Sequence, residues 1–189
     1  MDWVTTVGTT MVFGTAAYAG YLSMKNANAI TSIFSKSDQS PKGQLTQVIN
    51  ETKKSLDVAV FLFTENDLAA SISDAAERGV RIRLVTDQNQ VNYLPKQKAN
   101  IESLYNSGIP VKVNRHSGSM HLKILIADTK VITTGSYNFT TSAETRNDEV
   151  LVTIRSRKLA KEWTSQFEEM WHDETQFQAW TPSAYSKQA

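Results

Sequence analysis

The pattern of hydrophobic and polar positions predicts that helices and strands alternate along most of the chain. An amphipathic stretch, GQLTQVINETKKS, precedes the short apolar run LDVAVFLF, which is typical of a buried strand. The next stretch, TENDLAASISDAAERGV, has its apolar residues on one helical face, and the following VRIRLVTD alternates as a strand does. A strand, a helix and a second strand in this order predict a β-α-β unit.

The second half continues this alternation but brings two strands close together in the sequence. We expect a helix, a short strand, two strands around a tight Asp128–Thr129 turn, a further strand and a last helix. These elements cover KQKANIESLYNSGI, PVKV, HLKILIAD with KVITTGS, DEVLVTI and residues 157–171. Because two strands joined by a tight turn are antiparallel, the pattern predicts an α/β fold with a mixed β-sheet flanked by helices on both faces.

The N-terminal segment has a different character. Residues 3–24 carry no charged side chain, and at about 1.5 Å per helical residue they can just cross a hydrocarbon layer of roughly 30 Å. We interpret residues 1–24 as an N-terminal membrane anchor, residues 25–43 as a polar linker and residues 44–189 as the folded domain. The sequence does not indicate on which side of the membrane that domain would lie.

Two other interpretations of the N-terminal segment stay open. It resembles a secretory signal in having small residues at 27–29, although Asp2 stands where such signals carry positive charge. That interpretation predicts a secreted or periplasmic protein instead of a membrane-anchored one. The segment would also suit a helix that packs on a partner.

Charge is unevenly distributed along the chain, although the net charge is only +1. From Arg78 to Lys158 there are 13 Lys and Arg residues against 6 Asp and Glu residues. A local excess of this kind favours a polyanionic partner such as nucleic acid or an anionic lipid. The chain has no cysteine, which excludes disulfides, thiol nucleophiles and thiolate metal sites.

Polar side chains at fixed spacing surround the two strands that meet at the tight turn. His121 and Lys123 are two residues apart in HLKIL, so they project from the same face of a strand, and Ser136 and Asn138 follow the second strand in GSYN. A lysine ammonium, a hydroxyl and an amide can together hold a phosphate group, while an imidazole attacks it or transfers a proton. The recurrence of these residue types favours a functional site over a single histidine satisfied in a core.

This spacing, His-x-Lys-x₄-Asp-x₆-Gly-Ser-x-Asn, resembles the signature of the phospholipase D superfamily. The matching residues are His121, Lys123, Asp128, Gly135, Ser136 and Asn138. The resemblance extends over residues 44–173, whose order is similar to that of the short bacterial endonucleases in the family. It implies that the domain is catalytic and that Asp128 and Gly135 have structural roles.

The resemblance also implies a mechanism and an assembly. His121 would attack a phosphodiester and form a covalent phosphohistidine, while a second motif histidine would protonate the leaving oxygen. Only one motif is present, so two chains would form a homodimer with both His121 side chains at one site on the two-fold axis. Lys123, Ser136 and Asn138 would hold the phosphoryl oxygens, and Glu149 would hydrogen-bond the histidine.

Three residues near the motif are further candidates for binding substrate. Arg115 and Arg146 could contact backbone phosphates, and His116 lies in the loop just before the motif. No cluster of Asp, Glu and His has the spacing of metal ligands, so neither a metal nor another cofactor is expected.

The favoured function is a metal-independent phosphodiesterase that acts as an endonuclease on DNA or RNA. A membrane-anchored phospholipase acting on an anionic lipid such as cardiolipin is the alternative. A third hypothesis is an inactive dimer that binds nucleic acid, although the intact set of motif residues argues against lost catalysis.

Overall fold

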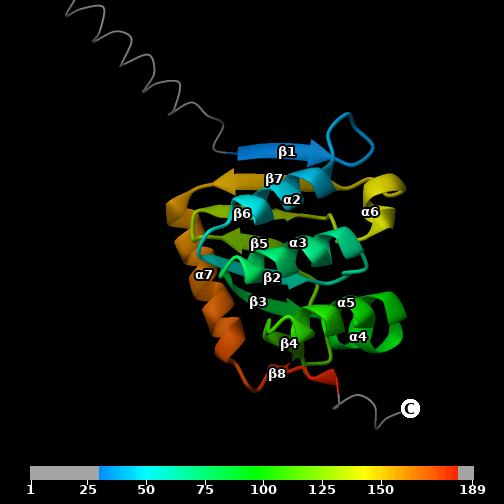
Figure 1. The fold of residues 1–189 in the computed structure, drawn as a ribbon, viewed down its shortest axis with the longest axis vertical. Coiled ribbons are helices and arrows are strands. Elements are labelled where there is room, and N and C mark those ends of the chain that lie inside the picture. Colours follow the sequence, from blue (N-terminus) through cyan, green and yellow to red (C-terminus); the bar gives the residue numbers. More distant parts are fainter. Residues whose placement is uncertain (1–29, 183–189) are drawn as a thin grey trace, which may run out of the picture.

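A mixed β-sheet of eight strands organises residues 30–182, the part of the chain that the computed structural model describes (Figure 1). Its strand order is β1-β7-β6-β5-β2-β3-β4-β8. The strands are β1 (Ile30–Phe34), β2 (Ser55–Val60), β3 (Arg81–Thr86), β4 (Val111–Asn114), β5 (Lys123–Ala127), β6 (Val131–Gly135), β7 (Val150–Arg155) and β8 (Phe177–Ala179). The helices are α2 (Pro41–Glu51), α3 (Asn66–Glu77), α4 (Gln88–Tyr93), α5 (Pro95–Asn106), α6 (Thr141–Thr145) and α7 (Arg157–His172). The predicted α/β fold class is therefore confirmed.

The directions of the strands bring the ends of several strands to one side of the sheet. Strands β2, β3 and β4 run parallel, whereas β5 pairs antiparallel with β2, and β6, β7 and β1 continue the antiparallel order. Consequently β5 and β7 begin at the edge where β1, β2 and β6 end. We call this row of strand ends the motif edge; it is distinct from the edge strands β1 and β8, and it lies on the right in Figure 1, toward α6.

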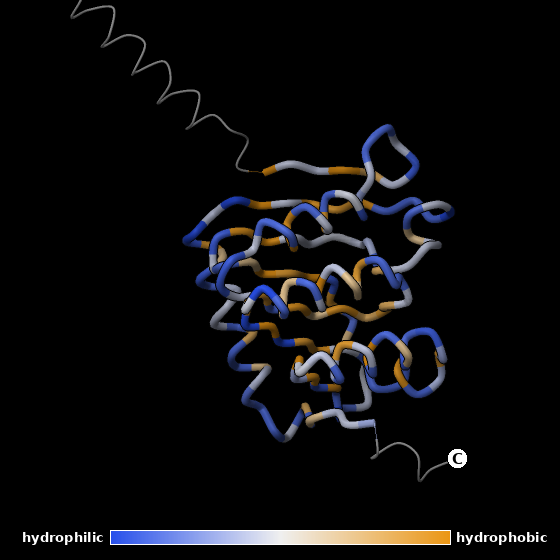
Figure 2. The backbone as a smooth tube through the Cα atoms, viewed as in Figure 1, coloured by the Kyte–Doolittle hydropathy of each residue, from blue (hydrophilic) through white to orange (hydrophobic). Residues whose placement is uncertain are grey.

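Helices cover both faces of the sheet, as the sequence predicts. Val58 and Val60 point into the larger core beneath α2, α3 and α5, whereas Ala59, between them, points into a second core beneath α7. Figure 2 shows hydrophobic residues concentrated along the central strands and polar residues on the outer turns of the helices. Burial on both faces explains why β2 appears in the sequence as a nearly continuous apolar run.

The prediction of a polar linker at residues 25–43 is wrong for residues 30–43, the part of it that the structure describes. Residues 30–34 form strand β1 at the edge of the sheet, and α2 already begins at Pro41 with Ser40 as its N-cap. At this edge strand Ile30 and Phe34 remain 63% and 60% exposed, so the strand lacks a buried apolar pattern. The expected anchor at residues 1–24 lies outside the described residues. Between residues 30 and 182, no helix has the length and apolar character needed to cross a membrane.

A buried ion pair attaches α7 to the sheet. The Arg83 guanidinium donates to Asp57 at 2.8 Å and to both carboxylate oxygens of Glu168 at 2.7 and 2.9 Å. Asp57 and Arg83 are neighbours on β2 and β3, and both are buried. Burial opposes the positive charge, but the two carboxylates outweigh it and raise the pKa of Arg83. The charge of Asp57 inside an apolar strand is thus compensated by a partner from the next strand.

The turn between β5 and β6 lies at the opposite edge of the sheet and is fixed by Asp128. Asp128 and Thr129 both have φ of 53°, as expected for the two central residues of a tight hairpin turn. The Asp128 carboxylate accepts backbone N–H groups from Lys53, Lys54 and Ser55, at distances down to 2.6 Å. It therefore joins the hairpin to the start of β2.

We predict that Asp128→Asn lowers the free energy of unfolding by about 1–2 kcal/mol at neutral pH, because one charged acceptor is lost while asparagine still tolerates positive φ. Partial burial alone would raise the pKa of Asp128, but the backbone donors outweigh it and lower the pKa below 3.8. The stabilisation is therefore complete above that value and disappears as pH falls through the lower folded-state pKa. Urea unfolding should show wild type and variant converging in acid; a constant difference from pH 7 to pH 2 would contradict this account.

Candidate active site

His121 and Lys123 lie together at the motif edge. The structure begins β5 at Lys123, so His121 lies just before the strand and is exposed, whereas Lys123 is only 8% exposed. The Lys123 ammonium is 3.1 and 3.2 Å from the two ring nitrogens of His121 and donates to its carbonyl at 2.9 Å. The Phe61 ring packs against the imidazole, with 4.5 Å between ring centroids. A cation and an imidazole therefore share one side of the edge, as their spacing predicts.

Lys123 is held in an environment that favours a bound anion. Burial lowers the pKa of its ammonium, and the negative charge of Glu149 partly opposes that change. The ammonium also lies 5.1 Å from the centre of the Phe61 ring. A partly desolvated cation of this kind gains electrostatic energy when an anionic group enters beside it.

The Gly-Ser-x-Asn segment passes close to the same edge. The Asn138 side-chain oxygen accepts the backbone N–H of Leu62 at 3.2 Å, next to Phe61. Because that oxygen is engaged, the amide nitrogen of Asn138 is the atom oriented to donate to a ligand. The Ser136 hydroxyl accepts the backbone N–H of Val150 at 3.2 Å, beside Glu149. Backbone contacts thus place both motif side chains at the motif edge.

Gly135 is required by a close approach between β6 and β7. Its φ is 147°, and a Cβ atom there would lie 2.0 Å from the carbonyl oxygen of Val150. Any other residue would separate the two strands at the point where Ser136 and Glu149 emerge. A side chain at position 135 is therefore excluded by steric contact with β7.

We predict that Gly135→Ala destabilises the protein more than Gly79→Ala. Gly79 also has positive φ, at 85°, but a Cβ atom there meets nothing within 4 Å. The Gly79 variant should lose about 1 kcal/mol from conformation alone, whereas the Gly135 variant adds overlap with Val150 and should lose at least about 2–3 kcal/mol. Chemical denaturation of both variants measures the difference, and equal losses would show that the close approach is not important.

Glu149 lies at the motif edge, but its hydrogen bond differs from the one that the resemblance implies. Its carboxylate accepts from the Asn147 side-chain amide at 3.0 Å. The ring nitrogens of His121 face Lys123 instead, so the expected bond from Glu149 to His121 is not formed among the described residues. Glu149 still influences the site through its charge on Lys123.

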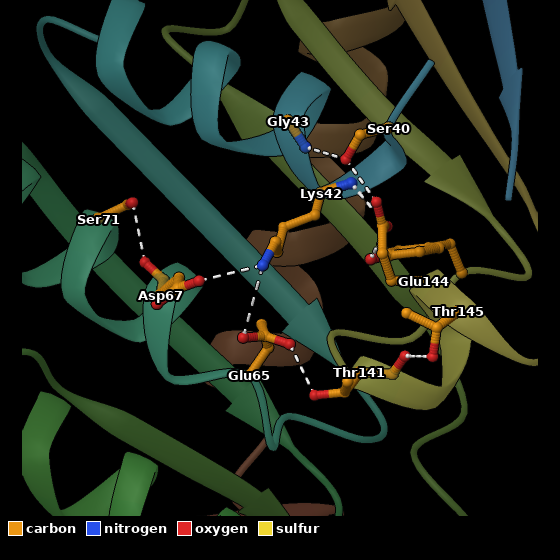
Figure 3. Close-up of polar contacts among 10 residues, drawn as sticks. Ser40, Lys42, Gly43, Glu65, Asp67, Ser71, Thr141, Glu144 and Thr145 are labelled. Atoms are coloured by element: carbon orange, nitrogen blue, oxygen red, sulfur yellow. Dashed lines mark hydrogen bonds and ion pairs between the residues drawn. The ribbon is translucent and has the colours of Figure 1, made fainter. Parts of the chain in front are cut away.

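A polar network behind the motif edge holds α6, which follows the motif (Figure 3). Glu144 of α6 accepts from the Ser40 hydroxyl at 2.5 Å, the Lys42 backbone at 3.2 Å and the Tyr137 hydroxyl at 2.6 Å. This fixes Tyr137, which lies between Ser136 and Asn138, against the N-terminus of α2. Sequence reasoning missed this network because its members are far apart in the chain.

The same network reaches α3, as Figure 3 also shows. The Thr141 hydroxyl donates to Glu65 at 3.0 Å, and the Lys42 ammonium forms an ion pair with Asp67 at 3.0 Å. The side-chain hydrogen bond with Asp67 raises the pKa of Lys42. The segment carrying Asn138 is therefore anchored to two helices of the larger core.

The other candidate residues occupy different positions. The Arg115 guanidinium donates to the Glu174 carbonyl at 3.2 Å, and the His116 ring packs on Phe177, with 5.8 Å between ring centroids. Both side chains therefore turn toward the C-terminal segment. Arg146 is exposed in the loop that leads to Glu149. Within residues 30–182, no three His, Cys, Asp or Glu side chains gather as a metal site would require.

A protein-family model described as "Cardiolipin synthase, PLD-like domain" matches residues 45–171. The chain belongs to the phospholipase D superfamily. The human protein named mitochondrial cardiolipin hydrolase is 31% identical over 133 residues, 70% of this chain and 52% of that protein. A protein of Rickettsia prowazekii named phospholipase D is 31% identical over 120 residues, 63% of this chain and 57% of that protein.

A solved structure of similar size shows the same fold. Nuc, a phospholipase D family member from Salmonella typhimurium, matches with a TM-score of 0.71 and 27% identity over 80% of this chain and 98% of Nuc. In contrast, this chain spans only 54% to 60% of the first three curated relatives, which are all named mitochondrial cardiolipin hydrolase. The likeness to Nuc therefore covers nearly the whole of that protein's chain.

Proposed function

We propose that this phospholipase D superfamily member is a phosphodiesterase in which His121 is the nucleophile. The observation that carries the proposal is the contact between His121 and the buried ammonium of Lys123 at an exposed edge of the sheet. The imidazole is accessible to a substrate, and the cation beside it suits a phosphate group. Ser136, Asn138 and Glu149 emerge at the same edge on backbone contacts that limit their movement.

In the proposed reaction, a ring nitrogen of His121 attacks phosphorus as the bond to the leaving oxygen breaks. The product is a covalent phosphohistidine, and the leaving oxygen takes a proton from an acid on the opposite side. Water then attacks phosphorus and gives a proton to that same group, now acting as a base, as the bond between phosphorus and the histidine nitrogen breaks. Lys123 and the Asn138 amide would stabilise the charge that develops on the phosphoryl oxygens, an effect commonly worth on the order of 10²–10³ in rate per donor.

The acid would come from a second copy of the chain. One chain supplies one motif histidine, and the two groups must act from opposite sides of phosphorus. His121 is exposed at the motif edge, as a residue on a dimer axis must be before association. A homodimer that joins two motif edges would therefore complete the site.

Nucleic acid is the substrate we favour. The excess of 13 basic over 6 acidic residues between Arg78 and Lys158 suits a polyanion, and the chain matches Nuc over nearly the whole of that protein. Cardiolipin, which is also a phosphodiester, is the second candidate. It is favoured by the names of relatives that are about 30% identical to this chain. An anchor at residues 3–24 would bring the site close to such a lipid.

We predict cleavage of DNA or RNA in the presence of EDTA. Purified protein should be incubated with single- and double-stranded DNA, RNA and cardiolipin vesicles, and products measured by electrophoresis or lipid chromatography. Complete loss of activity in EDTA with recovery in magnesium would reject the metal-independent mechanism. Hydrolysis of cardiolipin without cleavage of any nucleic acid would reject the favoured substrate and support the alternative.

We predict that His121→Ala abolishes turnover and that the defect is shared across the dimer. After subunit exchange at equal concentrations, about one quarter of the dimers are wild type, so activity should fall to about one quarter of that of the same total amount of wild-type protein. Independent sites would instead retain about one half. His172→Ala serves as the matched control, because His172 is an exposed residue near the end of α7 and its side chain is 75% exposed. That variant should retain full activity in the same mixing experiment.

A further inference from the structure

Strand β1 is followed by a turn that forms hydrogen bonds with the loop carrying Glu149. The Ser35 hydroxyl accepts the backbone N–H of Glu149 at 2.8 Å and donates to the carbonyl of Asn147 at 2.7 Å. The backbone N–H of Ser35 also donates to the carbonyl of Glu149 at 3.0 Å. Ser35 is only 8% exposed, so these bonds are largely shielded from water. One serine therefore holds Glu149 from both sides of its peptide backbone.

The next residue reinforces this grip. Lys36 forms an ion pair with Asp148 and donates to the carbonyl of Arg146 at 3.4 Å. Its φ is 59°, an uncommon conformation for lysine that costs on the order of 1 kcal/mol or more. Such a conformation persists when surrounding contacts determine it. Residues 35 and 36 together contact each residue from Arg146 to Glu149.

The orientation of the Glu149 side chain depends on the same contacts. Asn147, whose carbonyl is held by Ser35, donates from its side-chain amide to the Glu149 carboxylate at 3.0 Å. On the other side, Val150 is fixed by the Ser136 hydroxyl. Without the Ser35 hydroxyl, the segment between α6 and β7 would lose two of the three hydrogen bonds that Ser35 forms with it, and the Glu149 carboxylate would lose its fixed position at the site.

We propose that Ser35 is a positioning residue for the phosphodiesterase site, acting through Glu149. The inference rests on the proposed function and adds a residue outside the family-matched range of 45–171. Strand β1 would then contribute to the site, because its pairing with β7 from Ile30 to Phe34 places Ser35 at the motif edge.

The test compares Ser35→Ala with Ser37→Ala. Ser37 is a matched control, because its exposed hydroxyl donates only within its own turn, to the carbonyls of Phe34 and Gln39. We expect Ser35→Ala to lower kcat about tenfold with little change in KM, since misplacing a catalytic group by a fraction of an ångström has effects of this order. Ser37→Ala should retain wild-type kcat. Thermal unfolding of each variant verifies that the activity is measured on folded protein.

A double-mutant cycle with Glu149→Gln separates positioning from general destabilisation. If Ser35 acts through Glu149, adding Ser35→Ala to Glu149→Gln should cause less than about a twofold further loss. Exchange of the Glu149 amide hydrogen should also become faster in Ser35→Ala than in Ser37→Ala. A full tenfold loss in both backgrounds, or unchanged kcat and exchange in Ser35→Ala, would overturn the inference while the proposed function stands. An inactive wild-type protein would reject the proposed function itself, and with it the catalytic role of Ser35.

Discussion

The register in which β5 pairs with β2 determines whether the site exists. Lys123 lies opposite Val60, and Leu125 lies opposite Val58. Because side chains alternate between the faces of a strand, a slip of one residue would turn Lys123, together with His121, toward the face covered by α7. Asp128 opposes such a slip, because its carboxylate fixes the far end of the hairpin to the residues that begin β2. A hydrogen-bonded turn at one edge of the sheet thus sets the orientation of the cation at the other.

At the motif edge, separate chain segments are joined mainly through backbone groups. The Asn138 side chain binds the segment that follows β2, Ser136 binds the start of β7, and Ser35 binds the loop before β7. The positive charge of Lys123 is only partly compensated within one chain, because burial disfavours its ammonium and Glu149 offsets only part of that cost. Side chains fixed by backbone hydrogen bonds, together with the partly compensated cation of Lys123, form a site that suits an anionic group.

The sequence predicted the layered fold and the clustering of the motif because both depend on local regularities. Alternation and helical spacing reveal strands and helices, and the spacing between His121 and Lys123 places them on one side of a strand. It could not reveal contacts between distant segments. The sequence does not predict strand β1, because this exposed edge strand has no clear alternation of apolar and polar residues. The hydrogen bonds of Ser35, which follows β1, are therefore not predicted either. The direct bond expected between Glu149 and His121 depended on a side-chain arrangement that spacing alone cannot determine.

The most direct test of this account is to trap the covalent intermediate. Wild-type protein turning over a labelled oligonucleotide should be quenched in alkaline denaturant, because the bond between phosphorus and a histidine nitrogen is labile in acid, and the peptides analysed by mass spectrometry. We predict that a nucleotide fragment is attached to His121 and that the adduct is absent from His121→Ala. Continued turnover by His121→Ala, or an adduct on Ser136 in place of His121, would contradict the central claim that His121 is the nucleophile.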